Sequence, residues 1–230
     1  KKWVILGTTY GKAFSSKDTW AFFARYDQNT VDTLKNTFTQ EVNLNGQKMT
    51  VNNKNITVNG NTTAIELTKN NKNKDLKFHG GGNIQLTDNL NSGTGGFIFD
   101  EGQYYSITGK DKTYKGAGID IGKDTVVDWS VKGEVNDNLH KTGSGTLNVN
   151  VAQGNNLKMG DGTVVLNAAK AFNAIYVASG RGTVKLGQAD ALDKNSDYRG
   201  IYFTSRGGTL DLNGFSQSFK KIAATDVGTI

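Results

Sequence analysis

The chain contains neither cysteine nor proline. Without cysteine, disulfide bonds and thiolate metal sites are excluded. A chain of this length would carry about eleven prolines at average usage, and proline is kept out of central strands because it cannot donate a ladder hydrogen bond. Its absence, together with 29 glycines and many asparagines and threonines, favours a protein built almost wholly of strands and tight turns.

Long hydrophobic runs and a concentrated charge are missing as well. No apolar run of about 18 residues occurs, so no segment is predicted to span a bilayer as a helix. No signal peptide is recognisable, so an export signal would have to lie outside these residues. The net charge is +6, but the basic residues are scattered and arginine is rare. A nucleic-acid groove would interleave arginines with aromatics along one face, so no nucleic-acid partner is predicted.

The sequence has two textures. Residues 1–40 are rich in aromatics and open on a predicted buried strand, Trp3 to Leu6. Between Ser15 and Asn36, a partial helical spacing of apolar residues predicts one or two short helices or an aromatic-rich linker. From about residue 41 onward, strands of three to five residues with period-2 alternation are separated by Gly/Asn turns.

Within this second part, a Gly-Thr-aliphatic tripeptide recurs at separations of 17, 20, 26 and 20 residues. The copies are Gly145-Thr146-Leu147, Gly162-Thr163-Val164, Gly182-Thr183-Val184, Gly208-Thr209-Leu210 and Gly228-Thr229-Ile230. A turn of roughly 20 residues is typical of a parallel β-helix, in which each strand pairs with its equivalent one turn on. A Greek-key sandwich is the alternative, but it would not require one tripeptide per turn.

The alternation also predicts which side chains face the interior. The inward positions are Leu147, Val149, Val164, Leu166, Val184, Leu186, Leu210 and Leu212. The residues between them, Asn148, Val165, Lys185 and Asp211, are predicted to point outward. Glycine and asparagine at the corners supply the left-handed backbone conformations that corners need.

Five segments in order carry a resemblance to a known family. They read "YKGAGIDIGKDTVVDWSVKG", "DNLHKTGSGTLNVN", "LKMGDGTVVLN", "ASGRGTVKLGQ" and "RGGTLDLNG". Over about residues 80–230, their order and spacing resemble the passenger of the serine protease autotransporters, which include the enteric secreted proteases and the immunoglobulin A proteases (peptidase family S6).

The resemblance implies an all-β fold: a right-handed, single-stranded parallel β-helix of the pectin-lyase-like kind, preceded by the end of a chymotrypsin-like protease domain. Residues 1–40 would be the C-terminal strand of that protease domain plus a linker, and residues 41–230 the first rungs of the stalk. "WVILGTTYG" is similar to the strand that follows the nucleophile in such proteases. By that similarity Thr9, Tyr10 and Gly11 would bind peptide substrate, and the catalytic Gly-Asp-Ser-Gly segment would precede Lys1.

The resemblance further implies a secreted or cell-surface virulence factor of a Gram-negative bacterium, exported through the periplasm by its own C-terminal membrane β-barrel. Its partners would be an unidentified host protein substrate and the remainder of its own protease domain, and the chain itself would be a monomer. The parent would be a serine endopeptidase, whereas this chain, lacking the triad, would be inactive alone.

The residues themselves offer little catalytic chemistry. The two histidines, His79 and His140, are interpreted as turn or surface residues, because neither sits in a recognisable triad motif. "HGGG" at His79 to Gly82 is interpreted as a corner rather than as an oxyanion loop, and "KGAGIDIG" at Lys115 to Gly122 as a turn and a strand rather than as a calcium repeat. No metal-ligand spacing is present, so neither a metal nor a cofactor is expected.

Two classes of function remain open from the sequence. The first is a protease fragment, a solenoid stalk joined to the last piece of a catalytic domain. The second is a β-helical autotransporter adhesin without protease activity. A carbohydrate-cleaving β-helix would need paired acids converging in a groove, whereas the strands here show mostly Asn, Thr and Lys outward.

Overall fold

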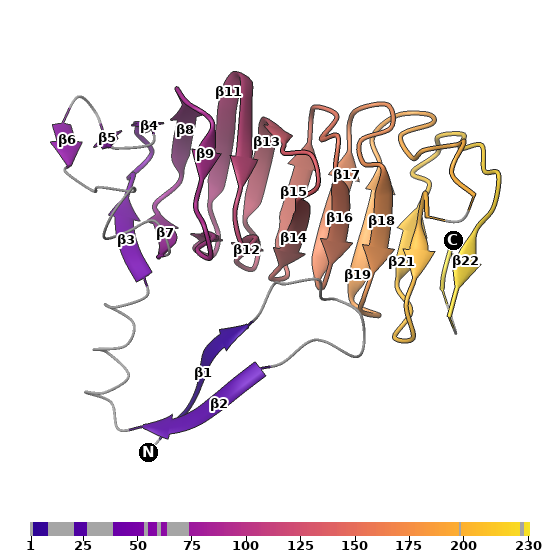
Figure 1. The fold of residues 1–230 in the computed structure, drawn as a ribbon, viewed down its shortest axis with the longest axis horizontal. Coiled ribbons are helices and arrows are strands. Elements are labelled where there is room, and N and C mark those ends of the chain that lie inside the picture. The colour runs from indigo at the N-terminus through magenta and orange to yellow at the C-terminus, as the bar shows by residue number, and fades with distance from the viewer. Residues whose placement is uncertain are drawn as a thin grey trace.

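The computed structural model describes residues 2–8, 21–26, 39–52, 55–58, 61–63, 74–197, 199–225 and 228–230. From residue 39 onward these residues form an elongated solenoid of two long sheets (Figure 1). The neighbours within each sheet are alternate strands in the sequence, so the chain passes from one sheet to the other and back on every turn. The predicted parallel β-helix is confirmed, and the Greek-key alternative is wrong.

The first sheet has nine strands. In spatial order they are β3 (Thr39–Asn43), β7 (Asp75–His79), β10 (Phe97–Phe99), β12 (Ile119–Ile121), β14 (Asn138–Thr142), β16 (Asn156–Met159), β18 (Ala174–Val177), β20 (Tyr202–Phe203) and β22 (Ala223–Ala224). All of their pairings are parallel.

The second sheet has eleven strands. They are β6 (Asn61–Thr63), β5 (Ile56–Val58), β4 (Lys48–Val51), β8 (Gly82–Leu86), β11 (Tyr104–Lys115), β13 (Val126–Gly133), β15 (Thr146–Val149), β17 (Gly162–Leu166), β19 (Gly182–Leu186) and β21 (Thr209–Asp211), with β9 (Leu90–Asn91) beside β11. Only the β4–β5–β6 end is antiparallel. This small meander continues the sheet past β4, where no further rung follows among the described residues.

The register of the second sheet is the one that the tripeptide repeat predicts. Thr146 pairs with Thr163, Thr163 with Thr183, Thr183 with Thr209, and an isolated bridge joins Thr209 to Thr229. One threonine row therefore runs through all five copies of the repeat.

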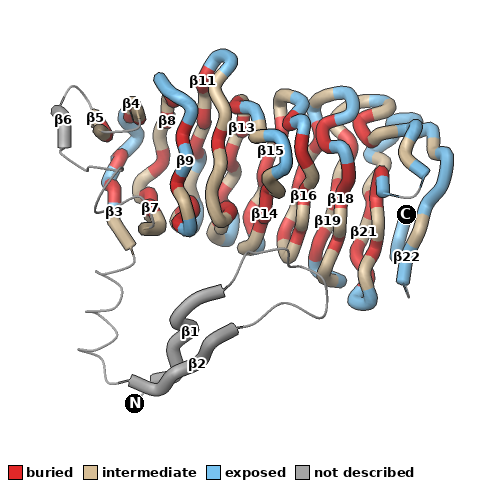
Figure 2. Tube along the Cα trace, in the orientation of Figure 1, coloured by how far each residue is buried: buried red, intermediate tan, exposed pale blue. Residues whose placement is uncertain are grey.

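The predicted inward residues form the interior, with one exception. Seven of the eight are at most 1% exposed: Leu147, Val149, Val164, Leu166, Val184, Leu186 and Leu210. Leu212 is only partly buried and packs at the edge of the core, because a single bridge continues this ladder beyond β21. Buried and half-buried positions alternate along the strands, and the exposed positions gather in the turns (Figure 2).

Nearer the N-terminal end, aromatic rings fill the interior. Phe78 packs edge-on against Phe97 with ring centroids 5.2 Å apart, and Tyr114 packs edge-on against Trp129 at 5.3 Å. Phe97 joins the two pairs through Tyr114 at 4.6 Å. Such tilted and edge-on pairs stabilise a core beyond the area that they bury.

The "HGGG" segment is a corner, as predicted. It turns the chain from β7 into β8 with positive φ at Gly80, Gly81 and Gly82. A Cβ atom on Gly82 would lie 2.4 Å from the carbonyl oxygen of Gln47 in the preceding turn. Only glycine therefore lets the two turns stack this closely.

Two expectations about secondary structure were wrong. Residues Ala21–Tyr26, placed in a helix or linker, form strand β2, which pairs antiparallel with β1 (Lys2–Thr8). Pairing with β1 outweighs the weak helical spacing, and aromatic residues have high strand propensity in any case. The strands β7, β14 and β16 were not predicted: β7 and β16 each alternate only two apolar residues with polar ones, and β14 buries a histidine and a lysine.

A matched pair of substitutions in β19 tests the register. Leu186 is fully buried, whereas the side chain of its neighbour Lys185 is 38% exposed and lies 4.0 Å from Asp211. Leu186→Ala should lower the free energy of unfolding by about 2–5 kcal/mol through lost burial and a cavity. Lys185→Ala should cost about 0.5 kcal/mol or less, because an exposed ion pair contributes little.

Denaturant unfolding and amide hydrogen exchange measure both effects. Since a rung contacts only its neighbours, Leu186→Ala should speed exchange in β17, β19 and β21 before it does so in β8. Equal destabilisation by the two substitutions would show that the register is wrong.

Candidate functional site

The substrate-binding residues expected from the family resemblance, Thr9, Tyr10 and Gly11, lie outside the described residues. The described solenoid carries polar groups of its own. Four features stand out: the surroundings of His79, the buried pair His140 and Lys141, a glycine corner, and a hollow lined by asparagines.

His79 lies at the end of β7 between two carboxylates. Its Nδ1 is 3.6 Å from Asp100 Oδ2, and its Nε2 is 3.7 Å from Glu41 Oε1. Asp100 is itself engaged, because it accepts hydrogen bonds from the Tyr105 hydroxyl and from the amide of Gly80. A triad histidine needs a nucleophilic hydroxyl on one side and a carboxylate on the other, so this arrangement is that of a structural histidine at a corner.

His140 was expected at a turn or on the surface, but it lies within β14 and is only 4% exposed. Burial, reinforced by the positive charge of Lys158, lowers the pKa of His140 to about 4. The imidazole is therefore neutral at physiological pH. The expectation for His140 was wrong because β14, the strand that buries it, was not predicted from the sequence.

Lys141 is the one cation in the interior of the described solenoid, with 0% exposure. In the ladder it lies between Ile119 and Met159, so its side chain occupies a position that aliphatic residues fill in the adjacent rungs. Its ammonium donates to three backbone carbonyl oxygens: Gly143 at 2.6 Å and Thr142 at 3.3 Å at the end of β14, and Asp161 at 2.9 Å at the corner after β16. These bonds satisfy the three ammonium protons.

Burial lowers the pKa of Lys141 to about 8, against the opposing effect of Asp120 and Asp161. The buried lysine therefore ties two successive corners together at the expense of desolvating a charge. The arrangement does not offer a nucleophile to substrates, because the amine has no access to solvent.

The glycine corner forms a shallow hollow of about 440 Å³ between the two sheets. Its lining residues are Gly46, Gly80, Gly81, Gly82, Asn83, Gln103, Tyr104 and Ser106. Tyr104 stands at its rim, 56% exposed, with its hydroxyl donating to Asp128. The Asn83 amide is already bonded to Ser106, so few groups here are left to hold a ligand.

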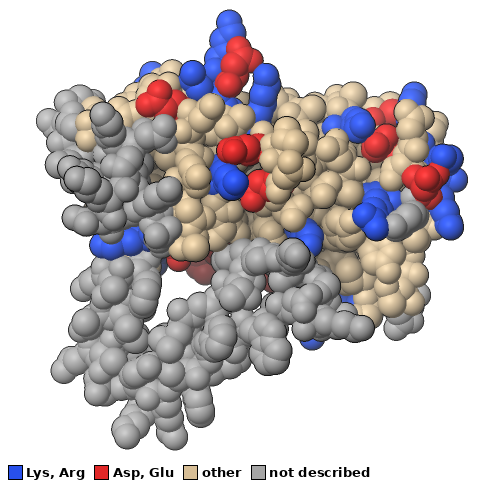
Figure 3. Space-filling model, in the orientation of Figure 1, with Lys and Arg blue, Asp and Glu red and all other residues tan. Residues whose placement is uncertain are grey.

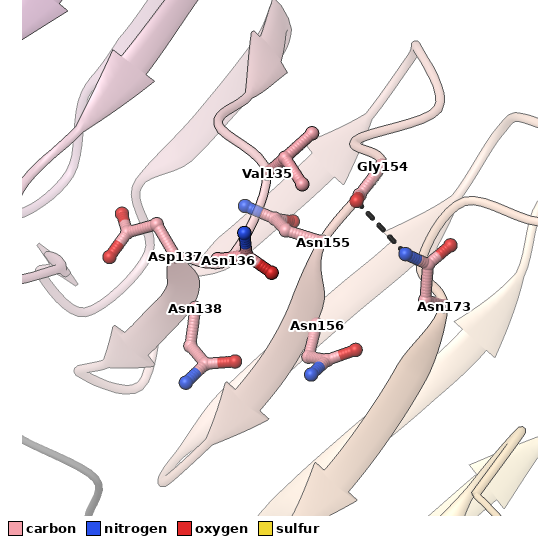
Figure 4. Close-up of a pocket in the computed structure, with 8 residues that line it drawn as sticks. All are labelled: Val135, Asn136, Asp137, Asn138, Gly154, Asn155, Asn156 and Asn173. Atoms are coloured by element: carbon pink, nitrogen blue, oxygen red, sulfur yellow. Dashed lines mark hydrogen bonds between the residues drawn. The ribbon is translucent and has the colours of Figure 1, made fainter.

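The hollow lined by asparagines, here called the asparagine hollow, has a volume of about 310 Å³. It lies where three successive turns stack before β14, β16 and β18 (Figure 4). Its lining residues are Val135, Asn136, Asp137, Asn138, Gly154, Asn155, Asn156 and Asn173. Asn138 and Asn156 are direct ladder partners, and Asn173 bonds the preceding turn through Gly154 O at 2.9 Å.

Asn155 is the unusual member of this hollow. It is 5% exposed, and its Oδ1 is buried without a hydrogen-bond partner. Its amide packs directly on Gly133, where a Cβ atom would lie 2.2 Å from Nδ2. Buried polar atoms in native proteins are nearly always satisfied by protein, water or a ligand, so a water molecule or a ligand is the expected partner of this oxygen.

The charges on the face shown in Figure 3 do not form a field of one sign. In Figure 3 lysines and arginines alternate with acids over the visible face, and the projection above β11 carries both signs. The ion pair between Lys132 and Asp111, 2.9 Å long, belongs to this projection. Within the described ranges, no group of three or more His, Cys, Asp or Glu side chains is placed to hold a metal ion, nor does any helix there have the length and hydrophobicity to cross a membrane.

Comparison with known proteins identifies the class. No protein-family model matches the chain. Serine protease EspC of Escherichia coli O127:H6 is 60% identical over 230 residues, which is 100% of this chain and 18% of that protein. Among solved structures, the passenger domain of the plasmid-encoded toxin of enteroaggregative Escherichia coli aligns with a TM-score of 0.74 and 46% identity, over 94% of this chain and 22% of that one.

The Haemophilus influenzae Hap adhesin aligns with a TM-score of 0.67 and 26% identity, over 84% of this chain and 25% of that one. The fold is thus shared by a named adhesin, which is less similar in sequence to this chain than EspC and the plasmid-encoded toxin are. The chain belongs to the serine protease autotransporters and corresponds to a β-helical part of their passenger domain. It spans about a fifth of the length of the curated protease that it matches.

Lys141 provides a prediction about pH. Its pKa falls from 10.5 in the unfolded chain to about 8 in the fold. Between those pH values the unfolded chain binds a proton that the folded chain does not, so this group makes stability rise with pH across that window. Below pH 8 both states are protonated and the effect of this group is constant.

Lys141→Met should remove that rise, which amounts to at most about 3 kcal/mol. The measurement is urea unfolding of both proteins at several pH values from 7.5 to 10.5, with Lys185→Met as the exposed control. Lys185→Met should retain the wild-type slope. A Lys141→Met protein whose stability follows the wild-type curve throughout would contradict the buried, carbonyl-bound lysine.

Proposed function

We propose that this chain is the stalk of a secreted serine protease: a rigid β-helical scaffold that carries a catalytic domain away from the bacterial surface. The observation that supports it most is the 60% identity to a named serine protease over the entire chain, joined to a passenger-domain fold. The solenoid suits this role, because its length grows by one rung at a time while its stability depends on neighbouring rungs alone.

We infer that residues 1–40 are the end of a chymotrypsin-like protease domain with a linker, and that residues 41–230 are the first part of the stalk. The support is a change of topology. The β1–β2 pair is antiparallel, as strands in chymotrypsin-like barrels are, whereas the first-sheet rungs that begin with β3 at Thr39 are parallel. In this assignment Thr9, Tyr10 and Gly11 line the substrate cleft.

The parent protein would be a serine endopeptidase whose nucleophile and triad histidine lie outside this chain. The two histidines support this, since His79 sits between carboxylates and His140 is buried. Autotransporter relatives are secreted or surface-exposed and have a C-terminal translocator domain. Export through the periplasm, a host protein as substrate and a monomeric stalk complete the proposal.

Labelling with a serine-directed fluorophosphonate tests whether the catalytic serine lies outside this chain. The purified 230-residue chain should show no specific labelling, because it supplies no triad, while the longer protein from the same gene should be labelled at one serine and cleave peptides. Specific labelling of one serine within the chain would contradict the proposal. An unlabelled longer protein that adheres to host cells would favour the adhesin alternative.

A further inference from the structure

We propose that the asparagine hollow binds a neutral sugar residue, which would give the stalk a glycan-binding site separate from proteolysis. The hollow is a built feature of three stacked turns lined by side-chain amides, and behind its surface the buried Asn155 Oδ1 has no hydrogen-bond partner. In Figure 4 the Asn155 amide points toward the turn that carries Val135 and Asn136, across the hollow.

The groups lining the hollow select the chemistry of the ligand. Side-chain amides dominate, and each offers both a donor and an acceptor, as a sugar hydroxyl requires. Among the described residues, no hydrogen bond engages the side-chain amides of Asn136, Asn138 or Asn156, so these remain available to a ligand. Val135, which is 70% exposed, supplies an apolar surface at the rim for the C–H face of a ring.

Charge argues against ionic ligands. No lysine or arginine lines the hollow, so a phosphate, sulfate or sialic acid would find no counter-charge. Asp137 is the one acid, and it already accepts hydrogen bonds from the backbone amides of Gly116 and Asn138 and interacts with Lys115. Burial raises its pKa. A calcium ion prefers several free carboxylates, so a single engaged one makes a poor cation site.

Spacing distinguishes a sugar from a peptide. Asn138 and Asn156 are paired across adjacent rungs, which places equivalent amides about 4.8 Å apart. Hydroxyls on alternate carbons of a sugar ring have about this separation. An extended peptide presents its donors on one side every second residue, about 6.6 Å apart, and so does not match the ladder. A volume of about 310 Å³ accommodates one sugar ring and leaves the neighbouring rings of a glycan outside.

The test is a titration of the chain, labelled with ¹⁵N on asparagine, followed through its side-chain amide signals. The probes are the methyl glycosides of glucose, galactose, mannose, N-acetylglucosamine and N-acetylgalactosamine. At least one should cause saturable shifts of the signals from the hollow, with a dissociation constant on the order of 1 mM, as expected for so small a ligand.

Asn156→Ala and Asn138→Ala should each weaken this binding about tenfold or more, the effect of losing one or two ligand hydrogen bonds. The control is Asn148→Ala, which removes an asparagine of the outer face, bonded to Asp128 at 2.8 Å, and should leave the affinity unchanged. A variant is informative only if its spectrum stays dispersed and wild-type-like. Two hollow variants are therefore made, so that the test survives if one of them fails to fold.

Three outcomes would overturn the proposal. One is the absence of saturable shifts with any glycoside up to about 100 mM, roughly a hundred times the expected constant. Another is binding that both hollow variants leave intact, which would place the sugar elsewhere. The last is a response to calcium chloride or to an unrelated peptide but to no glycoside. None of these outcomes bears on the protease assignment, which the fluorophosphonate experiment tests separately.

Discussion

In-register parallel pairing between successive turns is the constraint on which the rest of this molecule depends. Because each strand pairs with its equivalent one turn on, threonines and inward aliphatic residues each stack in rows from β15 to β21. Threonine lies on threonine, and aliphatic side chains lie on aliphatic side chains. A thin apolar pattern can then make a continuous core, since every inward residue is buried from both sides by its neighbours.

The same constraint explains where polar groups can collect. A polar side chain in an otherwise apolar row is packed between the rungs on either side, so it must find its hydrogen-bond partners within one turn. Lys141 does so by donating to the carbonyls of its own corner and the next one. Asn155 does not, although its backbone continues the stack to Asn173. The first residue is thus a structural tie, while the second has a buried acceptor without a hydrogen-bond partner in the protein.

Much of the second sheet could be predicted from the sequence, because the Gly-Thr-aliphatic tripeptide marks both the corner and the register of the strand that follows it. The first sheet was harder to predict. Its strand β14 alternates Leu139, His140 and Lys141, and no local rule says that a lysine will turn inward to reach backbone carbonyls. The strand β2 was misjudged for a different reason, since its partner β1 is distant enough in sequence for pairing to leave no local pattern.

The asparagine hollow could not be found from the sequence at all. Asparagines are frequent at the corners of this chain, and only the stacking of three particular turns brings Asn138, Asn155 and Asn173 around one space. Whether stacked turns leave a space between them depends on the spacing of their backbones. Sequence patterns report the identity of corner residues but not this spacing.

The register itself can be measured directly, because a chain without cysteine accepts spin labels only where cysteines are introduced. The outward row of the second sheet runs from Ser106 through Asp128, Asn148, Val165 and Lys185 to Asp211, one residue per rung. With labels at Asp211 and at one other position, pulsed electron paramagnetic resonance should give separations that grow by about 4.8 Å per rung. The predicted values are about 19 Å from Asp128 and about 24 Å from Ser106. Separations that do not increase in rung order would contradict the solenoid register and every assignment built on it.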